Sequence, residues 1–171
     1  MPALHALNAL DRARFAATLG AVFEHSPWVA EQAWAARPFA TLDALHGAML
    51  RAVRGAPRET QRALLRAHPE LAGREAHEGT LTADSASEQG RLGLTSLSRE
   101  ELERLAALNR RYRERFGFPC IIALRLHADR GSVIAAMARR VEADPDQEWN
   151  TALEQIAHIT RGRLEHLIGG G

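Results

Sequence analysis

The chain has 171 residues, of which 46% are hydrophobic and 25% charged, and its formal net charge at pH 7 is +1. These values are ordinary for a globular domain, so we expect one buried core. No apolar run approaches the roughly 20 residues needed to cross a bilayer, and the N-terminal residues lack the basic flank and apolar stretch of a secretion signal. We therefore expect a cytoplasmic protein that does not bind membranes.

The basic residues and the single cysteine exclude several classes of protein. All 22 basic residues are arginine, and they are interleaved with acids, so no basic stripe suited to a nucleic-acid backbone is present. Because the chain has no lysine, it cannot anchor pyridoxal phosphate or a substrate as a Schiff base. Cys120 is the only cysteine, which excludes an intrachain disulfide and a multi-thiolate metal site.

Helical periodicity dominates the sequence, and strand-like alternation is hard to find. We therefore expect an all-α fold, a single-domain bundle of about seven to nine helices over residues 1–168. The glycines at 169–171 are expected to form a flexible tail.

Capping residues, prolines and glycines predict four helices in the first half of the chain. Asn8 and Asp11 can cap the first helix, whose end is marked by Pro27. Thr41 can cap the third. The four predicted helices cover residues 11–26, 27–37, 42–55 and 57–67.

The second half begins where Pro69 disfavours helical geometry for the residue before it, which places His68 at a helix exit. Residues 73–80 are polar and predict a loop. Residues 118–124 form a short apolar run behind a helix, and we expect a buried extended segment that leads into a turn. Further helices are predicted at 83–92, 99–116, 133–143 and 146–168, the first three capped by Thr82, Ser98 and Ser132.

Two segments combine polar side chains in a way that suggests a site: residues 68–73 (HPELAG) and 85–89 (SASEQ). In the second, Ser85, Glu88 and Gln89 stand at helix positions i, i+3 and i+4 and share one face. A hydroxyl, a carboxylate and a carboxamide then point the same way. The alternative is a solvated polar face, which is where most such residues lie.

His68 also has two interpretations. A histidine at the C-terminal end of a helix can simply cap carbonyl groups and complement the helix dipole. The same helix end, together with a nearby Glu88 carboxylate, would favour the imidazolium form and let His68 exchange a proton near neutral pH.

Several long strings resemble a known family. HPELAG, LTADSASEQ, LNRRYRERFGFPCIIAL and the terminal RGRLEHL, preceded by FEHSPWVAEQAW, are similar in order and content to OHCU decarboxylases. OHCU is 2-oxo-4-hydroxy-4-carboxy-5-ureidoimidazoline. The resemblance covers nearly the whole chain.

The resemblance implies a site, residue by residue. His68 matches the family's catalytic histidine, and Glu88 matches the carboxylate that works beside it. Arg163 matches an arginine at the substrate, with Arg161 as the neighbouring alternative. The other matching positions are substrate-binding: Pro69, Ser85, Ala86, Ser87, Gln89, and the backbone of Cys120, Ile121, Ile122, Ala123 and Leu124. The family more often has phenylalanine where this sequence has Cys120, which affects local pocket shape but removes no proton-transfer group.

The resemblance also implies an activity: decarboxylation of OHCU to (S)-allantoin in urate degradation, by a lyase that uses neither a cofactor nor a metal. The partner is the small-molecule substrate, and a homodimer is compatible with the family. Two alternatives remain from the residues: a helical module that binds a protein partner, and a decarboxylase of a related ureido or imidazoline acid. A module that binds a protein partner does not require the polar face at residues 85–89 to lie against His68, whereas an enzyme does.

Overall fold

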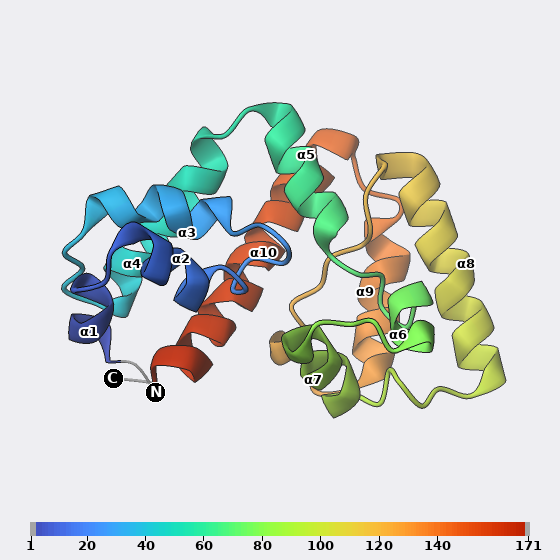
Figure 1. Ribbon diagram of the computed structural model, residues 1–171. Coiled ribbons are helices and arrows are strands. Elements are labelled where there is room, and N and C mark those ends of the chain that lie inside the picture. Colours follow the sequence, from blue (N-terminus) through green and yellow to red (C-terminus); the bar gives the residue numbers. More distant parts are fainter. Residues whose placement is uncertain (1–2, 170–171) are drawn as a thin grey trace. The chain divides into compact units, whose positions relative to one another are not determined.

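The computed structural model describes residues 3–169. These residues form ten α-helices and two 3₁₀ turns, η1 and η2, without a strand, which confirms the all-α prediction. Of the predicted glycine tail, residues 170 and 171 lie outside the described part of the chain. Figure 1 shows the helices coloured in chain order, and their bounds are α1 Leu4–Asn8, α2 Arg12–Leu19, α3 Trp28–Ala33, η1 Trp34–Ala36, α4 Leu42–Gly55, α5 Arg58–Ala67, α6 Arg74–Glu78, α7 Ala83–Arg91, α8 Arg99–Phe116, η2 Leu124–Leu126, α9 Arg130–Arg140 and α10 Pro145–Ile168.

The helices belong to two compact units. The first contains the chain up to Ala67 and again from Thr160, and the second contains residues 68–159. Helix α10 therefore supplies its N-terminal part to the second unit and its last residues to the first.

In the first unit, α3 packs against α2 and α4. Polar contacts of the segment after η1 tie it to the N-terminal helices. Asn8 bonds both backbone groups of Phe39, at 2.9 and 2.8 Å, and Arg37 donates to the carbonyl of Leu10 at 2.8 Å. The core consists of fully buried apolar side chains, among them Leu7, Phe15, Leu19, Leu45, Met49, Leu64 and Leu65.

In the second unit, α8 packs against α9, and α7 contacts η2. Helix α8 begins with the predicted capping box between Ser98 and Glu101, and it ends at Gly117, which adopts the left-handed conformation. Its apolar face carries Tyr112, whose ring lies 5.9 Å from that of Phe118. Residues 118–124 are buried and irregular until they enter η2, as expected.

Three local predictions were wrong. The first long helix, α2, ends at Leu19 because the chain turns there and His25 takes a φ of 47°, outside the helical region. Residues 74–78, expected as a loop, form α6, which has an Arg74–Glu78 ion pair of 2.9 Å one turn apart. The caps of α2, α4, α7 and α8 at Asp11, Thr41, Thr82 and Ser98 are confirmed.

The third error concerns the cap of α9. Asp129, rather than Ser132, is the N-cap residue, and its carboxylate accepts the backbone N–H of Ser132 at 2.8 Å. The Ser132 hydroxyl donates back to the Asp129 carbonyl, also at 2.8 Å. Asp and Ser are both favoured N-cap residues. Asp129 is the N-cap here because its carboxylate accepts a backbone N–H of the first turn that has no partner within the helix.

Candidate functional site

The candidate site begins where α5 ends. Helix α5 stops at Ala67, and His68 follows as predicted, with Pro69 preventing the helix from continuing. His68 is only 6% exposed. The imidazole therefore sits in a protected environment, where a neighbouring charge acts on it more strongly than it would in water.

Helix α7 carries the second candidate segment. Thr82 caps the helix by accepting the N–H of Ser85 at 3.3 Å. Ser85 and Gln89 are almost fully buried, Glu88 is half-buried, and the remaining two residues of the SASEQ segment, 86 and 87, are exposed. The alternative interpretation, a solvated polar face, is therefore wrong for Ser85 and Gln89.

The loop after His68 and helix α7 are hydrogen-bonded to each other. The side chain of Gln89 accepts the N–H of Ala72 through Oε1 at 2.9 Å. Its Nε2 donates to the carbonyl of Glu70 at 3.4 Å. The HPELAG and SASEQ segments, separate in sequence, thus form one structural unit.

Helix α8 supplies residues of this neighbourhood to which the sequence assigned no role. Asn109 is 4% exposed and donates through Nδ2 to the carbonyl of Leu71 at 2.9 Å. Arg113, one turn further along, forms an ion pair with the side chain of Glu70. The sequence does contain a pointer to Asn109, because it is a polar residue on the otherwise apolar face that carries Leu105 and Tyr112.

The segment of residues 120–124 is held by side chains from three helices. Arg140 donates to the carbonyl of Ile121, Gln155 accepts the N–H of Ala123 at 2.8 Å, and Arg91 donates to the carbonyl of Leu124. This segment is therefore fixed through its backbone, with its apolar side chains buried.

Cys120 itself is 1% exposed, and burial raises the pKa of its thiol to about 12. A thiolate is the nucleophilic form of cysteine, so this shift argues against nucleophilic catalysis by Cys120.

Beside this segment lies a buried polar cluster that the sequence did not reveal. Glu148 is 1% exposed, and it accepts the hydroxyl of Tyr112 at 2.5 Å and the Nε–H of Arg140 at 2.7 Å. Burial raises the pKa of Tyr112 far above its ordinary value, so the phenol stays protonated and acts as a donor. The cluster positions Arg140, which in turn fixes the carbonyl of Ile121.

Arg163 belongs to the first unit, where it is 6% exposed. Its guanidinium donates to Glu24 Oε2 at 2.8 Å and to the carbonyl of Val22 at 3.3 Å. Glu24 is itself 2% exposed. The sequence predicted the arginine but missed this buried carboxylate partner.

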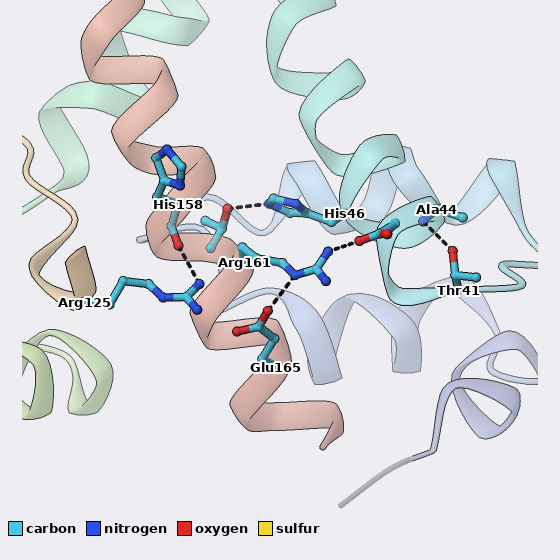
Figure 2. Close-up of polar contacts among 9 residues, drawn as sticks. Thr41, Ala44, His46, Arg125, His158, Arg161 and Glu165 are labelled. Atoms are coloured by element: carbon cyan, nitrogen blue, oxygen red, sulfur yellow. Dashed lines mark hydrogen bonds and ion pairs between the residues drawn. The ribbon is translucent and has the colours of Figure 1, made fainter. Parts of the chain in front are cut away.

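Arg161, the alternative arginine, has a different environment (Figure 2). It bonds Glu165 at 2.8 Å and also pairs with Asp43, and these two hydrogen bonds raise its pKa. All three side chains line an open cleft of about 680 Å³ within the first unit. In the same unit, His46 is hydrogen-bonded to Thr160 at 3.0 Å.

Two features are absent from residues 3–169. No group of three or more histidine, cysteine, aspartate or glutamate side chains there is arranged to hold a metal ion. No helix in the same range has both the length and the apolar character required for a membrane span.

Fold and site together define a class: an all-α protein in which a loop with a buried histidine is hydrogen-bonded to a helix that carries a glutamate. The family model described as OHCU decarboxylase matches residues 8–165, so the chain belongs to the OHCU decarboxylase family. This confirms the resemblance noted in the sequence.

Individual relatives agree with the family assignment. The chain is 42% identical over 163 residues to 2-oxo-4-hydroxy-4-carboxy-5-ureidoimidazoline decarboxylase of Mus musculus, covering 95% of this chain and 91% of that protein. It is 44% identical over 161 residues to the protein of the same name from Haloferax volcanii, covering 94% and 93%.

Solved structures are similar as well. A crystal structure of (S)-allantoin synthase superposes with a TM-score of 0.75 at 33% identity; the match covers 98% of this chain and 54% of that one, so this chain spans about half its length. A structure of OHCU decarboxylase in the presence of (S)-allantoin matches with a TM-score of 0.67 over 93% of this chain and 99% of that chain. At 21% identity it shows the fold alone.

Proposed function

We propose that this chain is a decarboxylase that converts OHCU to (S)-allantoin in urate degradation. Membership of the family supports the reaction, and the names of the relatives supply the substrate and product. The observation that carries the proposal to particular residues is the hydrogen bonding of Gln89 to the backbone of Glu70 and Ala72. It joins the segment that contains His68 to the helix that contains Glu88.

The chemistry of the substrate explains why no cofactor is needed. Loss of carbon dioxide leaves an electron pair, which many decarboxylases store on pyridoxal phosphate or thiamine. In OHCU the carboxylate is attached beside an imidazoline C=N bond, so the electrons can delocalise into the ring. A proton delivered to one face of the resulting carbanion then sets the configuration of the product.

In this proposal His68 exchanges a proton with the substrate hydroxyl or with the reacting carbon, and Glu88 orients and charges the imidazole. The burial of His68 supports this role, since a protected imidazole responds strongly to one nearby carboxylate. Ser85 on the same helix face would fix the ring of the substrate.

The remaining substrate contacts are also part of the proposal. Pro69, Ala86 and Ser87 would border the substrate, and the backbone of residues 120–124 would bond it. Hydrogen bonds with Arg140, Gln155 and Arg91 hold the backbone of that segment, which supports such a role. A backbone that is already fixed loses little conformational entropy when its polar groups bind a substrate. Arg163 would bind a substrate anion.

We propose a cytoplasmic enzyme, since the single cysteine is buried and unpaired with another thiol, as in reducing compartments. Its partner would be the small molecule rather than a nucleic acid or a membrane. A homodimer is proposed as its assembly, and sedimentation velocity would show a mass of one chain if that is wrong.

The test of function is a coupled assay. Hydroxyisourate and its hydrolase generate OHCU in the cuvette, the purified protein is added, and the optical rotation of the allantoin is followed. We expect a rate proportional to the amount of protein and a product of one hand. If the protein neither accelerates loss of OHCU nor changes the optical activity, the proposed function is wrong.

A further inference from the structure

One peptide group in the HPELAG loop is held on both sides by side-chain amides. The carbonyl of Leu71 accepts Nδ2 of Asn109, and the N–H of Ala72 donates to Oε1 of Gln89, each at 2.9 Å. The carbonyl and the N–H belong to the same peptide bond. Two helices, α8 and α7, therefore fix the plane of a single peptide group.

The burial of this peptide makes the two hydrogen bonds necessary. Leu71 is 5% exposed and Ala72 is 6% exposed, so water cannot easily replace a lost partner. Buried backbone donors and acceptors are almost always paired because an unpaired one is costly. The side chains of Asn109 and Gln89 are themselves 4% and 2% exposed, so they too are committed to these partners.

The conformation of the loop also requires support. Ala72 has a φ of 49°, in the left-handed region that disfavours a residue with a Cβ atom. Such a conformation persists only where the surroundings determine it, and it occurs often at functional sites. The bond from Gln89 attaches directly to the N–H of this strained residue.

Two further contacts restrain the loop at Glu70, two residues after His68. Gln89 Nε2 donates to the carbonyl of Glu70 at 3.4 Å, and the side chain of Glu70 pairs with Arg113. Because Pro69 restricts the backbone between Glu70 and His68, a fixed Glu70 limits the directions in which the imidazole can point.

We propose that Gln89 and Asn109 are positioning residues, which hold the Leu71–Ala72 peptide and thereby set the orientation of His68. The proposal rests on the proposed function in taking His68 as the proton-transfer group. It changes the role expected for Gln89, since both ends of its carboxamide are used on the loop. It also adds Asn109 as a second positioning residue.

The first experiment compares four single variants in the coupled assay. Gln89→Met and Asn109→Leu keep approximate shape but remove the polar groups, and we expect kcat to fall about 10–100-fold, the size typical of a displaced catalytic group. KM should change less than about threefold, because binding groups are left in place. Gln89→Glu keeps an oxygen that can accept the Ala72 N–H and loses only the longer 3.4 Å bond to Glu70, so it should retain more of kcat than Gln89→Met. Asn109→Asp replaces the donor with a second acceptor facing the Leu71 carbonyl, so it should not.

Gln61 provides a matched control. It is another buried glutamine, and its Nε2 donates to the carbonyls of Val53 and Arg54 near the end of α4, at 2.9 and 3.2 Å. Gln61→Met should lower the melting temperature while kcat stays within about twofold of the parent. An equal loss of kcat in Gln61→Met would mean that any buried glutamine matters, and the proposal would be overturned.

Two further readouts separate positioning from stability. The Gln89→Met/Asn109→Leu double variant should lose no more kcat than the worse single variant, because both changes release the same peptide. The enantiomeric excess of the allantoin should fall in Gln89→Met, since a misdirected proton donor no longer serves one face. Unchanged kcat in folded Gln89→Met and Asn109→Leu, or a rise in KM alone, would overturn the proposal.

A comparison with His68→Asn separates this proposal from the proposed function. If His68→Asn loses activity while folded Gln89→Met and Asn109→Leu do not, only the positioning role fails. If a folded His68→Asn protein retains activity, the proton-transfer role of His68 fails, and the positioning role that depends on it fails as well. Should Gln89→Met not fold, the Glu and Asp variants decide: Gln89→Glu must keep a higher kcat than Asn109→Asp, and the reverse order would refute the proposal.

Discussion

The buried ion pair between Arg163 and Glu24 makes a quantitative prediction. The two side chains are 5% and 2% exposed and lie 2.8 Å apart, so neither charge can be solvated if the other is removed. Removing one member of such a pair costs about 3–5 kcal/mol, because the remaining charge stays buried. For a protein of this size each kcal/mol lowers Tm by about 2–4 °C, so Glu24→Ala should lower Tm by about 6–20 °C.

Circular dichroism during thermal unfolding measures this effect. The Arg163→Met/Glu24→Leu double variant should recover much of the loss, since an apolar pair of similar volume can replace a buried ion pair. The prediction is wrong, and fails, if Glu24→Ala lowers the free energy of unfolding by less than about 1 kcal/mol, the range of an exposed pair. It also fails if the double variant loses the sum of two single losses.

Tyr112, Cys120 and His127 of the second unit each have surroundings that predict a measurable effect. Tyr112→Phe removes the donor to buried Glu148 and should cost about 1.5–3 kcal/mol, seen as a lower urea midpoint with an unchanged m-value; an unchanged midpoint would contradict it. The pKa of the Cys120 thiol is about 12, so about one part in 10⁴ is thiolate at pH 8. A thiol reagent should therefore label Cys120 rapidly only after the protein unfolds. Fast labelling of the native protein would refute this prediction. Burial lowers the pKa of His127 below 6.5 in the folded protein, because it disfavours the charged imidazole. Neutral His127 therefore stabilises the fold above pH 6.5, and this part of the free energy of unfolding is lost as the pH falls through the lowered pKa. An NMR titration midpoint above 6.5 for His127 would contradict this prediction.

Much of the fold could be predicted because helix boundaries are local. Thr41, Thr82 and Ser98 each bond a backbone N–H three residues ahead, so the cap and its target lie in one short window of sequence. The predicted cap of α9 was wrong because two suitable N-cap residues, Asp129 and Ser132, lie in the same short window. Which of them caps the helix depends on the path of the backbone. Helix α6 is too short for periodicity to reveal.

The long-range hydrogen bonds of the HPELAG loop and of Arg163 could not be predicted, because the bonded residues are distant in sequence. Asn109 bonds Leu71 across 38 positions, and Arg163 bonds Glu24 across 139. A sequence pattern reports which face of a helix is apolar, but it does not report which backbone group a buried amide will meet. The motifs therefore located the HPELAG and SASEQ segments, and only the structure gave the hydrogen bonds that join them.

We propose that His68 transfers the proton that makes OHCU decarboxylation fast and stereospecific. The most direct test is the single-turnover rate of OHCU consumption by His68→Asn, beside the parent protein and with folding verified by circular dichroism. We predict a loss of about 10²–10⁴-fold, with optical activity lost from the residual product. A folded His68→Asn protein that still forms (S)-allantoin at the parental rate would contradict this role of His68.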